Sequence, residues 1–552
     1  MFQAIRQLSI LNRLFNVNGS EWPRIGYAWI LRFLYRSSFV IGWTVLVGMF
    51  VTKYGIISLP YLFILNAIFS IIGSVLYSVL QNRFERKNLM IVTVFISGVL
   101  LLIANLFFAS NDKVFFALLI VTVGLFLTQL KIILNAYLEE FFTSLQSERT
   151  FPLIESAETI GGILAGLVVF SFSNLFSVFS FMYLWIGLLV FMVPLILWHK
   201  DFDQVIHLTS ESNEDDSNGL FSDIKKILSR KDFGTYFSGL ISVVLFQWLI
   251  FNLLEFQYTK AVYSNVSGVI LEAGSGFEHA FIHDLGILFV VFSTSSLIIQ
   301  FFLGSRIINY LGIVGSLLLH PLVTLFSLLG LTAHFNFDTA VLAKNNFTMS
   351  SVIHTNAYHI SYYALKEDFR ERIREFLEGV IRPVGAIIGT LLLIVLQNLL
   401  RGNELIFSIN VLMVFATAAL FYVTYKQQDK YTQIVINDLL QGQDIQIKRN
   451  ALDVLAQRGH KISIKVLRGI LFNQNELTSL RIRALRALAA PQDQNTILDI
   501  VKCFDDKNIY IRNASLDVLI SNKPFCAIRK ENLYLKYLLI NSLKKLYGRE
   551  KD

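Results

Sequence analysis

The sequence predicts an all-α, polytopic membrane protein with about twelve transmembrane helices in two parallel six-helix repeats, followed by a helical domain outside the membrane. Three observations carry this prediction. The 552-residue chain is 54% hydrophobic and only 16% charged, with a mean hydropathy of +0.56, which is outside the range of ordinary soluble domains. The second part of its apolar region repeats the first. A polar tail with a shorter repeat of its own comes last.

The apolar region contains about twelve segments that are long enough to span a bilayer, which takes roughly 20 residues of helix. In the first repeat they are 25–50, 56–80, 89–109, 114–137, 153–172 and 176–198. In the second they are 235–257, 285–304, 311–332, 338–363, 376–398 and 404–425. The 48 Phe and 21 Tyr suit lipid-facing and interfacial positions.

The two halves of the apolar region match residue by residue. Leu31-Arg32-Phe33-Leu34-Tyr35 recurs 223 positions later as Leu254-Glu255-Phe256-Gln257-Tyr258. The same offset relates Arg83 to Arg306, Arg149 to Arg372, Glu155 to Glu378, Gly162 to Gly385 and Gly166 to Gly389. Asn135-Ala136-Tyr137 returns as Asn356-Ala357-Tyr358 at an offset of 221. Matches in one order along the chain predict a duplicated helical unit.

Basic residues fix the expected orientation. They concentrate in the even-numbered connections, whereas the other side carries scattered cations such as Lys53, Lys113 and Arg401. By the positive-inside rule both termini are then cytoplasmic, and we expect a multi-pass protein of a bacterial inner membrane. The net charge of +8 indicates topology, because no aromatic-basic stripe of a nucleic-acid partner is present. No cleaved signal is expected either, since Arg6 and Arg13 lie in a polar stretch.

Four regions follow from these patterns. Residues 1–198 and 233–428 form the two membrane halves. Residues 199–232 form a cytoplasmic linker, acidic at first and then an amphipathic helix on the membrane surface. Residues 429–552 form the tail.

The tail repeats an apolar-basic-x-x-small-Leu pattern. It occurs at Ile447–Leu452, Leu480–Leu485 and Ile511–Leu516. A period of about 30 residues is typical of stacked helical hairpins, so we expect a HEAT-like α-solenoid that offers a surface to a protein partner. The chain has two cysteines, Cys503 and Cys526, which in a cytoplasmic tail are expected to be reduced, buried thiols and not a disulfide or metal site.

Charges inside the predicted spans are the candidate substrate-binding residues. Each is costly in a membrane, so each needs a partner or a function. They are Arg32, Arg36, Lys131, Glu255 and Lys344. The repeat assigns Arg32 and Glu255 to equivalent positions of opposite charge, which predicts a pair facing each other across a central cavity. Such a pair either gates a substrate path or holds the halves together, and the sequence favours neither.

Other polar residues near span ends are expected to latch the halves together or to pack them. The gating or latch residues are Glu140, Glu155, Glu158, Glu378, Arg382, Arg83 and Arg306. The repeated glycines allow close helix packing, and His354 is expected to be a hydrogen-bonded interior residue. No Walker A loop, dinucleotide turn or metal-ligand spacing occurs in the sequence, so we expect neither an enzyme nor a bound cofactor or metal.

Two parallel six-helix halves resemble the major facilitator superfamily, and three stretches resemble its ATP/ADP translocase family. They are Ile30-Leu31-Arg32 with Arg36, then Asn82–Lys87, and Glu140 through Arg149-Thr150-Phe151-Pro152-Leu153. The resemblance implies nucleotide exchange, with Arg36 and Glu140 at the places of a basic and an acidic family residue. The eleventh span departs from the family, because Ala386 follows Arg382-Pro383-Val384-Gly385 where the family carries a lysine. The fusion to a HEAT-like tail resembles bacterial translocase-like proteins.

The predicted function is alternating-access transport of an anionic solute, for which the resemblance implies a nucleotide. The halves would rock about a site near the membrane midplane. The alternative is a scaffold or sensor of the same fold that no longer transports and recruits a partner through its tail.

Overall fold

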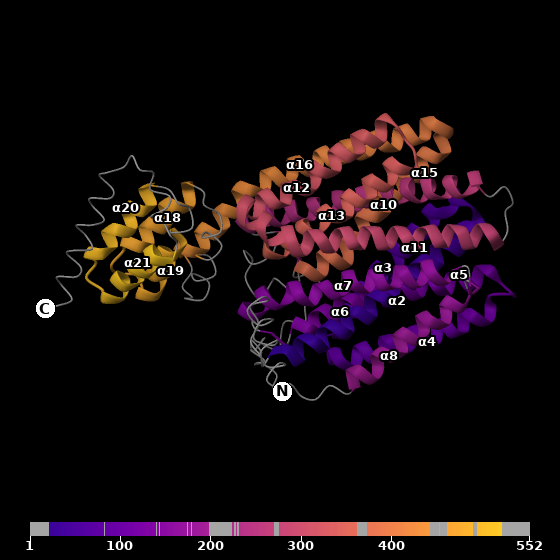
Figure 1. The fold of residues 1–552 in the computed structure, drawn as a ribbon, viewed down its shortest axis with the longest axis horizontal. Helices are drawn as coiled ribbons and strands as arrows, with labels where there is room; N and C mark the ends of the chain where they lie inside the picture. The colour runs from indigo at the N-terminus through magenta and orange to yellow at the C-terminus, as the bar shows by residue number, and fades with distance from the viewer. Residues whose placement is uncertain are drawn as a thin grey trace.

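The computed structural model of the protein is a bundle of long helices joined to a small helical tail (Figure 1). It describes residues 21–81, 83–139, 141–142, 144–173, 175–177, 179–197, 224–225, 228, 231–269, 275–361, 373–441, 452, 461–488 and 494–521. The predicted linker of 199–232 therefore lies almost entirely outside the described residues.

The first half of the bundle contains six membrane-length segments. The first two are α2 (Trp22–Tyr54) and α3 (Leu59–Gln81), joined by the short η2 (Ile56–Ser58), and the third is α4 (Arg86–Phe107). The fourth consists of α5 (Asp112–Val121), the π-helical η3 (Thr122–Leu127) and α6 (Thr128–Glu139) in continuous succession. The last two are α7 (Ser144–Phe172) and α8 (Ser180–Leu197).

The second half follows the same plan. It comprises α10 (Lys231–Val269), α11 (Ser275–Ile298), the π-helical η4 (Ile299–Gly304), α12 (Ser305–Ala333), α13 (Phe337–Ser361), the π-helical η6 (Leu377–Ile381), α15 (Arg382–Leu399) and α16 (Gly402–Gln441).

The described part of the chain contains 11 helical segments that are long and apolar enough to cross a membrane. This confirms the predicted all-α, multi-pass fold. The expected tenth span, α13, is absent from that set because Lys344, Asn345 and Asn346 make it more polar. Some predicted boundaries were short: α10 continues to Val269, beyond the expected end at residue 257, and α16 continues to Gln441, beyond the expected end at residue 425.

A polar side chain at the point where the predicted span ends finds partners within the bundle. The Gln257 side-chain amide donates to the Ile406 carbonyl at 3.0 Å and to Asn410 Oδ1 at 2.8 Å. A helix satisfies its own backbone in a membrane, so it can continue wherever its side chains are also satisfied. Hydropathy alone does not reveal such partners.

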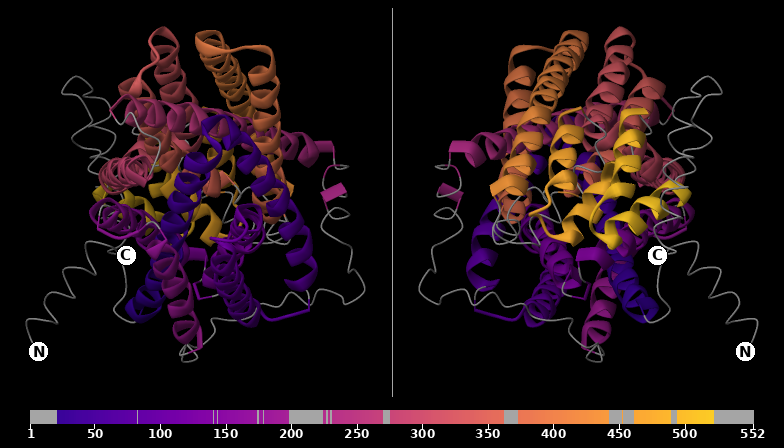
Figure 2. Two further views of the ribbon diagram at one scale, coloured as in Figure 1. Left: turned by 90° about the vertical axis from the view of Figure 1, so that its right-hand side faces the viewer. Right: turned by 90° about the vertical axis from the view of Figure 1, so that its left-hand side faces the viewer.

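The two halves repeat each other in their packing. Within the first half, α2 lies along α7 and α8, and within the second, α10 lies along α15 and α16. The halves meet through α7 against α11 and through α15 against α3, which are the pairs that a two-fold axis would exchange. The two views of Figure 2 show the indigo-to-magenta first half below the pink-to-orange second half.

Glycines allow the α7–α11 contact between the halves. A Cβ atom on Gly166 would lie 2.9 Å from the Gly286 carbonyl oxygen, and one on Gly162 would lie 2.9 Å from Ser293 Oγ. The backbones therefore approach as in other small-residue membrane contacts. Thr159 donates to Gln300 Oε1 at 3.2 Å, and His279 Nδ1 bonds to the Ser173 carbonyl, so polar contacts join the halves at two levels.

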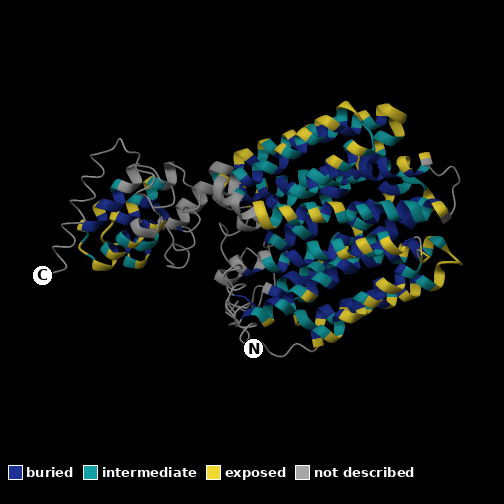
Figure 3. Cartoon of the chain, in the orientation of Figure 1, coloured by how far each residue is buried: buried dark blue, intermediate teal, exposed yellow. Residues whose placement is uncertain are grey.

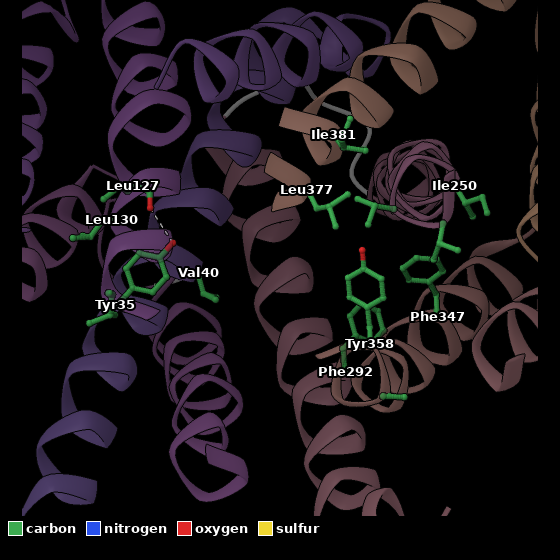
Figure 4. Packing of buried hydrophobic residues seen from close by; sticks show 14 of the residues in the cluster. Tyr35, Val40, Leu127, Leu130, Ile250, Phe292, Phe347, Tyr358, Leu377 and Ile381 are labelled. Carbon is green, nitrogen blue, oxygen red and sulfur yellow. Dashed lines mark hydrogen bonds between the residues drawn. The ribbon is translucent and has the colours of Figure 1, made fainter. Parts of the chain in front are cut away.

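Apolar side chains fill each half and also cover its outside. Buried residues concentrate between the helices, whereas exposed ones lie on the outer surfaces (Figure 3). Outward-facing residues such as Phe95 and Phe326 are 68% and 70% exposed, as expected of a surface solvated by lipid. Inside, the Tyr35 hydroxyl donates to the Leu127 carbonyl at 3.1 Å (Figure 4).

The described tail consists of α18 (Lys461–Phe472), α19 (Thr478–Leu488), α20 (Gln494–Lys502), the short η7 (Cys503–Asp505) and α21 (Ile509–Ser521). α18 packs on α19, and α19 packs on α21. Arg481 of α19 pairs with Asp506, whose backbone carbonyl also accepts a hydrogen bond from Arg512 at 3.0 Å. These basic positions are the repeated ones, so successive units are linked through them. The assignment to the HEAT class stays a prediction.

Candidate functional site

One face of α2 borders the space between the two halves. From Leu31 to Phe50 every residue is buried except Phe33, Arg36, Phe39 and Trp43. Their spacing of three or four residues places them on one side of the helix, and Trp29 continues the stripe by one turn. Arg36 interacts electrostatically with Lys131 of α6 and with Arg382 of α15. The stripe therefore faces residues of both halves.

A matching stripe runs along α10. Its half-buried residues include Ile241, Leu245, Trp248, Phe251 and Glu255. Each of these stands 212 positions after one residue of the α2 stripe. The two helices thus present equivalent faces, one from each half.

Glycine contacts give the same register. A Cβ atom on Gly161 of α7 would lie 2.9 Å from the Phe33 carbonyl oxygen of α2, and one on Gly385 of α15 would lie 2.6 Å from the Leu245 carbonyl oxygen of α10. Phe33 and Leu245 are again 212 positions apart. Two independent features therefore relate α2 and α10 by 212 residues and not by 223.

The predicted pairing of Arg32 with Glu255 is therefore wrong. A difference of 11 residues is about three helical turns, so it preserves the helix face but moves a residue by roughly 16 Å along the axis. The structural counterpart of Glu255 is Trp43, and that of Arg36 is Trp248. The sequence match misled because residues three turns apart share a face.

Arg32 instead joins a buried cluster within the first half. Its guanidinium donates to Asn135 Oδ1 at 2.8 Å and lies 3.9 Å from Glu155 and 3.8 Å from Glu158. Glu158 also accepts a hydrogen bond from Lys131 Nζ at 3.4 Å. The cluster ties α2, α6 and α7 together, so Glu155 and Glu158 are partners of cations from their own half.

Arg36 and Arg382 come from opposite halves and share one environment. The Arg382 guanidinium stacks 3.6 Å from the ring centre of Trp248, and Arg36 lies 5.9 Å from that of Phe39. Neither guanidinium forms an ion pair with a described residue. Glu158 interacts electrostatically with both guanidinium groups, and Glu378 interacts with that of Arg382.

Glu255 and Lys344 form a separate pair within the second half. Lys344 Nζ of α13 donates to Glu255 Oε2 of α10, and their side chains are only 9% and 14% exposed. The ammonium also lies 4.1 Å from the ring centre of Phe251. One cation, Lys344, and one anion, Glu255, are thus buried together beside the Phe251 ring.

The remaining predicted latch residues have different surroundings. Glu378 lies 3.5 Å from Arg374 one turn away on the same segment, and Arg83 is exposed between α3 and α4. Glu140 and the side chain of Arg306 lie outside the described residues. The gating role of this set stays a prediction.

Sequence reasoning missed the aromatic members of the stripes and one histidine. Trp29 and Phe33 stack with ring centres 5.3 Å apart, and Trp43 lies 6.3 Å from Phe39. A spacing of three or four residues among aromatics in the first span was the available signal. His320 also lies inside the bundle, 5.1 Å from His354 between ring centres.

In the described part of the chain, no group of three or more His, Cys, Asp or Glu side chains is placed to hold a metal ion. The arrangement offers cations and aromatic faces instead. Chemically it can bind an anion with an apolar or planar part.

No protein-family model matches the sequence, and no curated protein matches it. The structure does resemble solved structures. A point mutant of the nucleoside transporter NupG superposes with a TM-score of 0.54 at 16% sequence identity, covering 73% of this chain and 99% of NupG. A point mutant of the E. coli fucose:proton symporter FucP gives a TM-score of 0.51 at 13% identity, covering 73% of this chain and 98% of FucP. At such identities the likeness shows a common fold alone.

Proposed function

We propose that this protein is an alternating-access transporter of an anionic solute, and that the solute is a nucleotide. One observation carries the proposal. Arg36 of the first half and Arg382 of the second interact with each other in the space between the halves, and neither has an ion-pair partner among the described residues. A charge without a direct ion-pair partner inside a membrane domain is costly, so a bound anion is the expected additional counter-charge.

The site also has the features that distinguish a nucleotide from a simple anion. Guanidinium groups bind phosphate through paired hydrogen bonds. Aromatic rings on both sides supply flat faces, with Phe33 and Phe39 flanking Arg36 on α2, and Trp248 beneath Arg382. A base can stack on such faces. Phosphate on the arginines and base on the rings would use both halves at once.

A ligand that touches both halves explains how binding would change access. Arg36 belongs to α2 and Arg382 to α15, so release of the anion leaves two like charges facing each other. Their repulsion favours separation of the halves on one side of the membrane, and a new anion favours closure. Rocking of one six-helix unit against the other needs no further chemistry.

Uptake into proteoliposomes tests the proposal. Labelled ATP or ADP is offered to wild type, Arg36→Ala, Arg382→Ala and the control Lys113→Ala, whose side chain is exposed near the start of α5. A lost charge-assisted contact is worth about 1.5–3 kcal/mol, so we expect each site variant to reduce uptake by roughly tenfold or more. Lys113→Ala should remain within about twofold of wild type.

The outcomes separate the parts of the proposal. Equal uptake by wild type and Arg36→Ala removes Arg36 from the site. Transport of other organic anions but not of nucleotides retains the anion site and rejects the substrate class. No transport of any anion by folded wild type, with no thermal stabilisation by any, rejects the function.

A further inference from the structure

The α10 stripe carries a carboxylate where the α2 stripe carries a ring. Glu255 takes the position that Trp43 occupies in the first half. Between residues 249 and 259 of α10, only Phe251 and Glu255 are not fully buried, so both belong to the face that borders the space between the halves. A carboxylate repels phosphate. This end of the stripe therefore suits a different part of the ligand.

The Glu255–Lys344 pair lies some distance from the arginines along the same stripe. Glu255 follows Trp248 by seven residues, which is two helical turns and about 10.5 Å. The Arg382 guanidinium lies 3.6 Å from the centre of the Trp248 ring, which lies 4.7 Å from that of Phe251. The Lys344 ammonium lies 4.1 Å from the Phe251 ring centre. The sugar and the base of a nucleotide together span such a distance, so a nucleotide with its phosphate on the arginines presents the edge of its base to the pair.

The pair keeps hydrogen-bonding capacity after its two members have bonded to each other. An ammonium group has three donors and a carboxylate has two acceptor oxygens. The contact uses one Lys344 proton and Glu255 Oε2. No other described residue forms a hydrogen bond with Lys344 Nζ or Glu255 Oε1. An acceptor and two donors thus remain side by side.

A buried hydroxyl one turn further along α10 also lacks a partner. Tyr258 is 3% exposed, and its hydroxyl has no hydrogen bond to a described residue. The charges of Glu255 and Asp284 act on it, so it shares the environment of the pair. An unsatisfied buried hydroxyl is rare, because its lost hydration is not compensated. This end of the stripe therefore offers a hydroxyl, a carboxylate oxygen and ammonium protons to a polar ligand.

Among the nucleic-acid bases, guanine has the edge that matches these groups. It carries a carbonyl oxygen, O6, beside two donors, N1–H and the 2-amino group. A carboxylate accepts from amino groups of bases, and lysine is a common partner of O6. Adenine, cytosine and uracil each offer a single donor group on this edge. They would leave part of the carboxylate without a donor.

We propose that Glu255 and Lys344 form a base-recognition site and that the transported nucleotide is a guanine nucleotide. The proposal rests on the proposed nucleotide transport and adds which base the protein selects. The Glu255 carboxylate accepts from N1–H and the 2-amino group, the Lys344 ammonium donates to O6, and the Tyr258 hydroxyl accepts the second amino hydrogen. Trp43, the counterpart of Glu255 in the other half, supplies a flat face for the base.

Ligands that share one phosphate and differ in the edge of the base test the selection. Binding of GMP, IMP, 1-methyl-GMP and AMP to wild type in nanodiscs is measured by isothermal titration calorimetry. A good two-point base contact is worth roughly tenfold or more in discrimination. We therefore expect GMP to bind roughly tenfold or more tightly than AMP, with IMP, which lacks the 2-amino group, in between. 1-methyl-GMP, which lacks the N1 donor, should lose most of the advantage. 7-deaza-GMP, altered on the other edge, should remain within about twofold of GMP.

Variants then assign the selection to the pair. Glu255→Gln keeps the shape of the side chain and removes one of its two acceptors, so the preference for GMP over AMP should fall to within about threefold. Glu404→Gln, which alters an exposed carboxylate in the first turn of α16, is the matched control and should keep the preference. Arg36→Ala should weaken GMP and AMP alike, because both carry the phosphate on which it acts.

The outcomes separate base recognition from transport of nucleotides. Equal binding of GMP and AMP, or tighter binding of AMP, overturns the guanine assignment and retains the proposed function. A preference for GMP that persists in Glu255→Gln overturns the role of the pair. If that variant does not fold, 1-methyl-GMP decides on wild type, since binding as tight as that of GMP overturns the edge contact. Binding of neither nucleotide by folded wild type rejects the proposed function, and base recognition with it.

Discussion

Buried charges in this protein are compensated in two different ways. Arg32, Lys131 and Lys344 have carboxylate partners, whereas Arg36 and Arg382 rest on aromatic rings. The first kind joins helices within each half, and the second forms the proposed anion site. The sequence identified every one of these residues from its cost in a membrane. It could not sort them, because the carboxylate partners are more than 25 residues away on other helices.

The Glu255–Lys344 pair provides a test of the first kind. Lys344→Met leaves the Glu255 carboxylate buried without its partner, which in buried pairs costs about 3–5 kcal/mol. Lys53→Met is the matched control, since Lys53 and Asp112 pair at 2.7 Å but are 55% and 41% exposed and such a pair is worth about 0–1 kcal/mol. Thermal unfolding should show a much larger loss for Lys344→Met, and adding Glu255→Gln should recover most of it. Equal losses in the two single variants would contradict the assignment.

Cys503 in the tail offers a test at the same scale. Burial, and next the nearby Asp506 and Asp499 carboxylates, raise the pKa of its thiol to about 12. Only the thiolate reacts readily, so on a Cys526→Ser background maleimide labelling at pH 8 should be on the order of a thousandfold slower than in the unfolded chain. Because the unfolded thiol ionises first, this group also lowers stability as pH rises above about 8.5. Rapid labelling of folded protein would show the thiol to be accessible.

At the scale of single helices, the sequence indicated the faces but not the depths. The helical spacing of the α2 and α10 stripes was predictable, and in α2 every residue between Leu31 and Phe50 that lies off the stripe is buried. Their register was not, because the match at 223 residues and the register at 212 differ by whole turns. Only the glycine contacts of α7 and α15 with these helices distinguish the two. Contacts between elements, and not patterns within them, fix the height of a residue in the membrane.

The α7–α11 contact can be tested through its glycines. In Gly166→Ala the new methyl would lie 2.9 Å from the Gly286 carbonyl oxygen and 3.0 Å from Val290 Cγ2, and backbone cannot yield cheaply, so we expect a loss of about 1–3 kcal/mol. The control is Gly187→Ala on α8, where no atom lies within 4 Å and helix propensity favours Ala by about 1 kcal/mol. Thermal unfolding should therefore move in opposite directions. A neutral Gly166→Ala would mean that the halves are not held by close backbone contact.

At the scale of the whole molecule, duplication determines how the halves can move. Equivalent contacts recur within each half, α2 with α8 and α10 with α16, whereas α7 with α11 and α15 with α3 make the most extensive contacts between the halves. The sequence predicted this arrangement from order and offset alone, because a repeated hydrophobic pattern can bury its faces in only a few ways. The packing of the tail was harder to predict from the sequence, because the period of its repeat indicates stacked hairpins but not what those hairpins contact.

Rigid halves that rock predict which distances change when a nucleotide binds. Lys113 near the start of α5 and Arg401 between α15 and α16 are exposed at one end of the bundle, one in each half, and Ile57 between α2 and α3 is 71% exposed at that end of the first half. Spin labels at Lys113 and Arg401, in protein without native cysteines, should change separation when ATP is added. The pair Lys113 and Ile57 should keep its distance, because both positions belong to one six-helix unit. If the protein is a scaffold that no longer transports, pulsed electron–electron double resonance will show both spin-label distances unchanged at saturating ATP. A change in the within-half pair would mean that helices move singly, and the two-body description of the fold would fail.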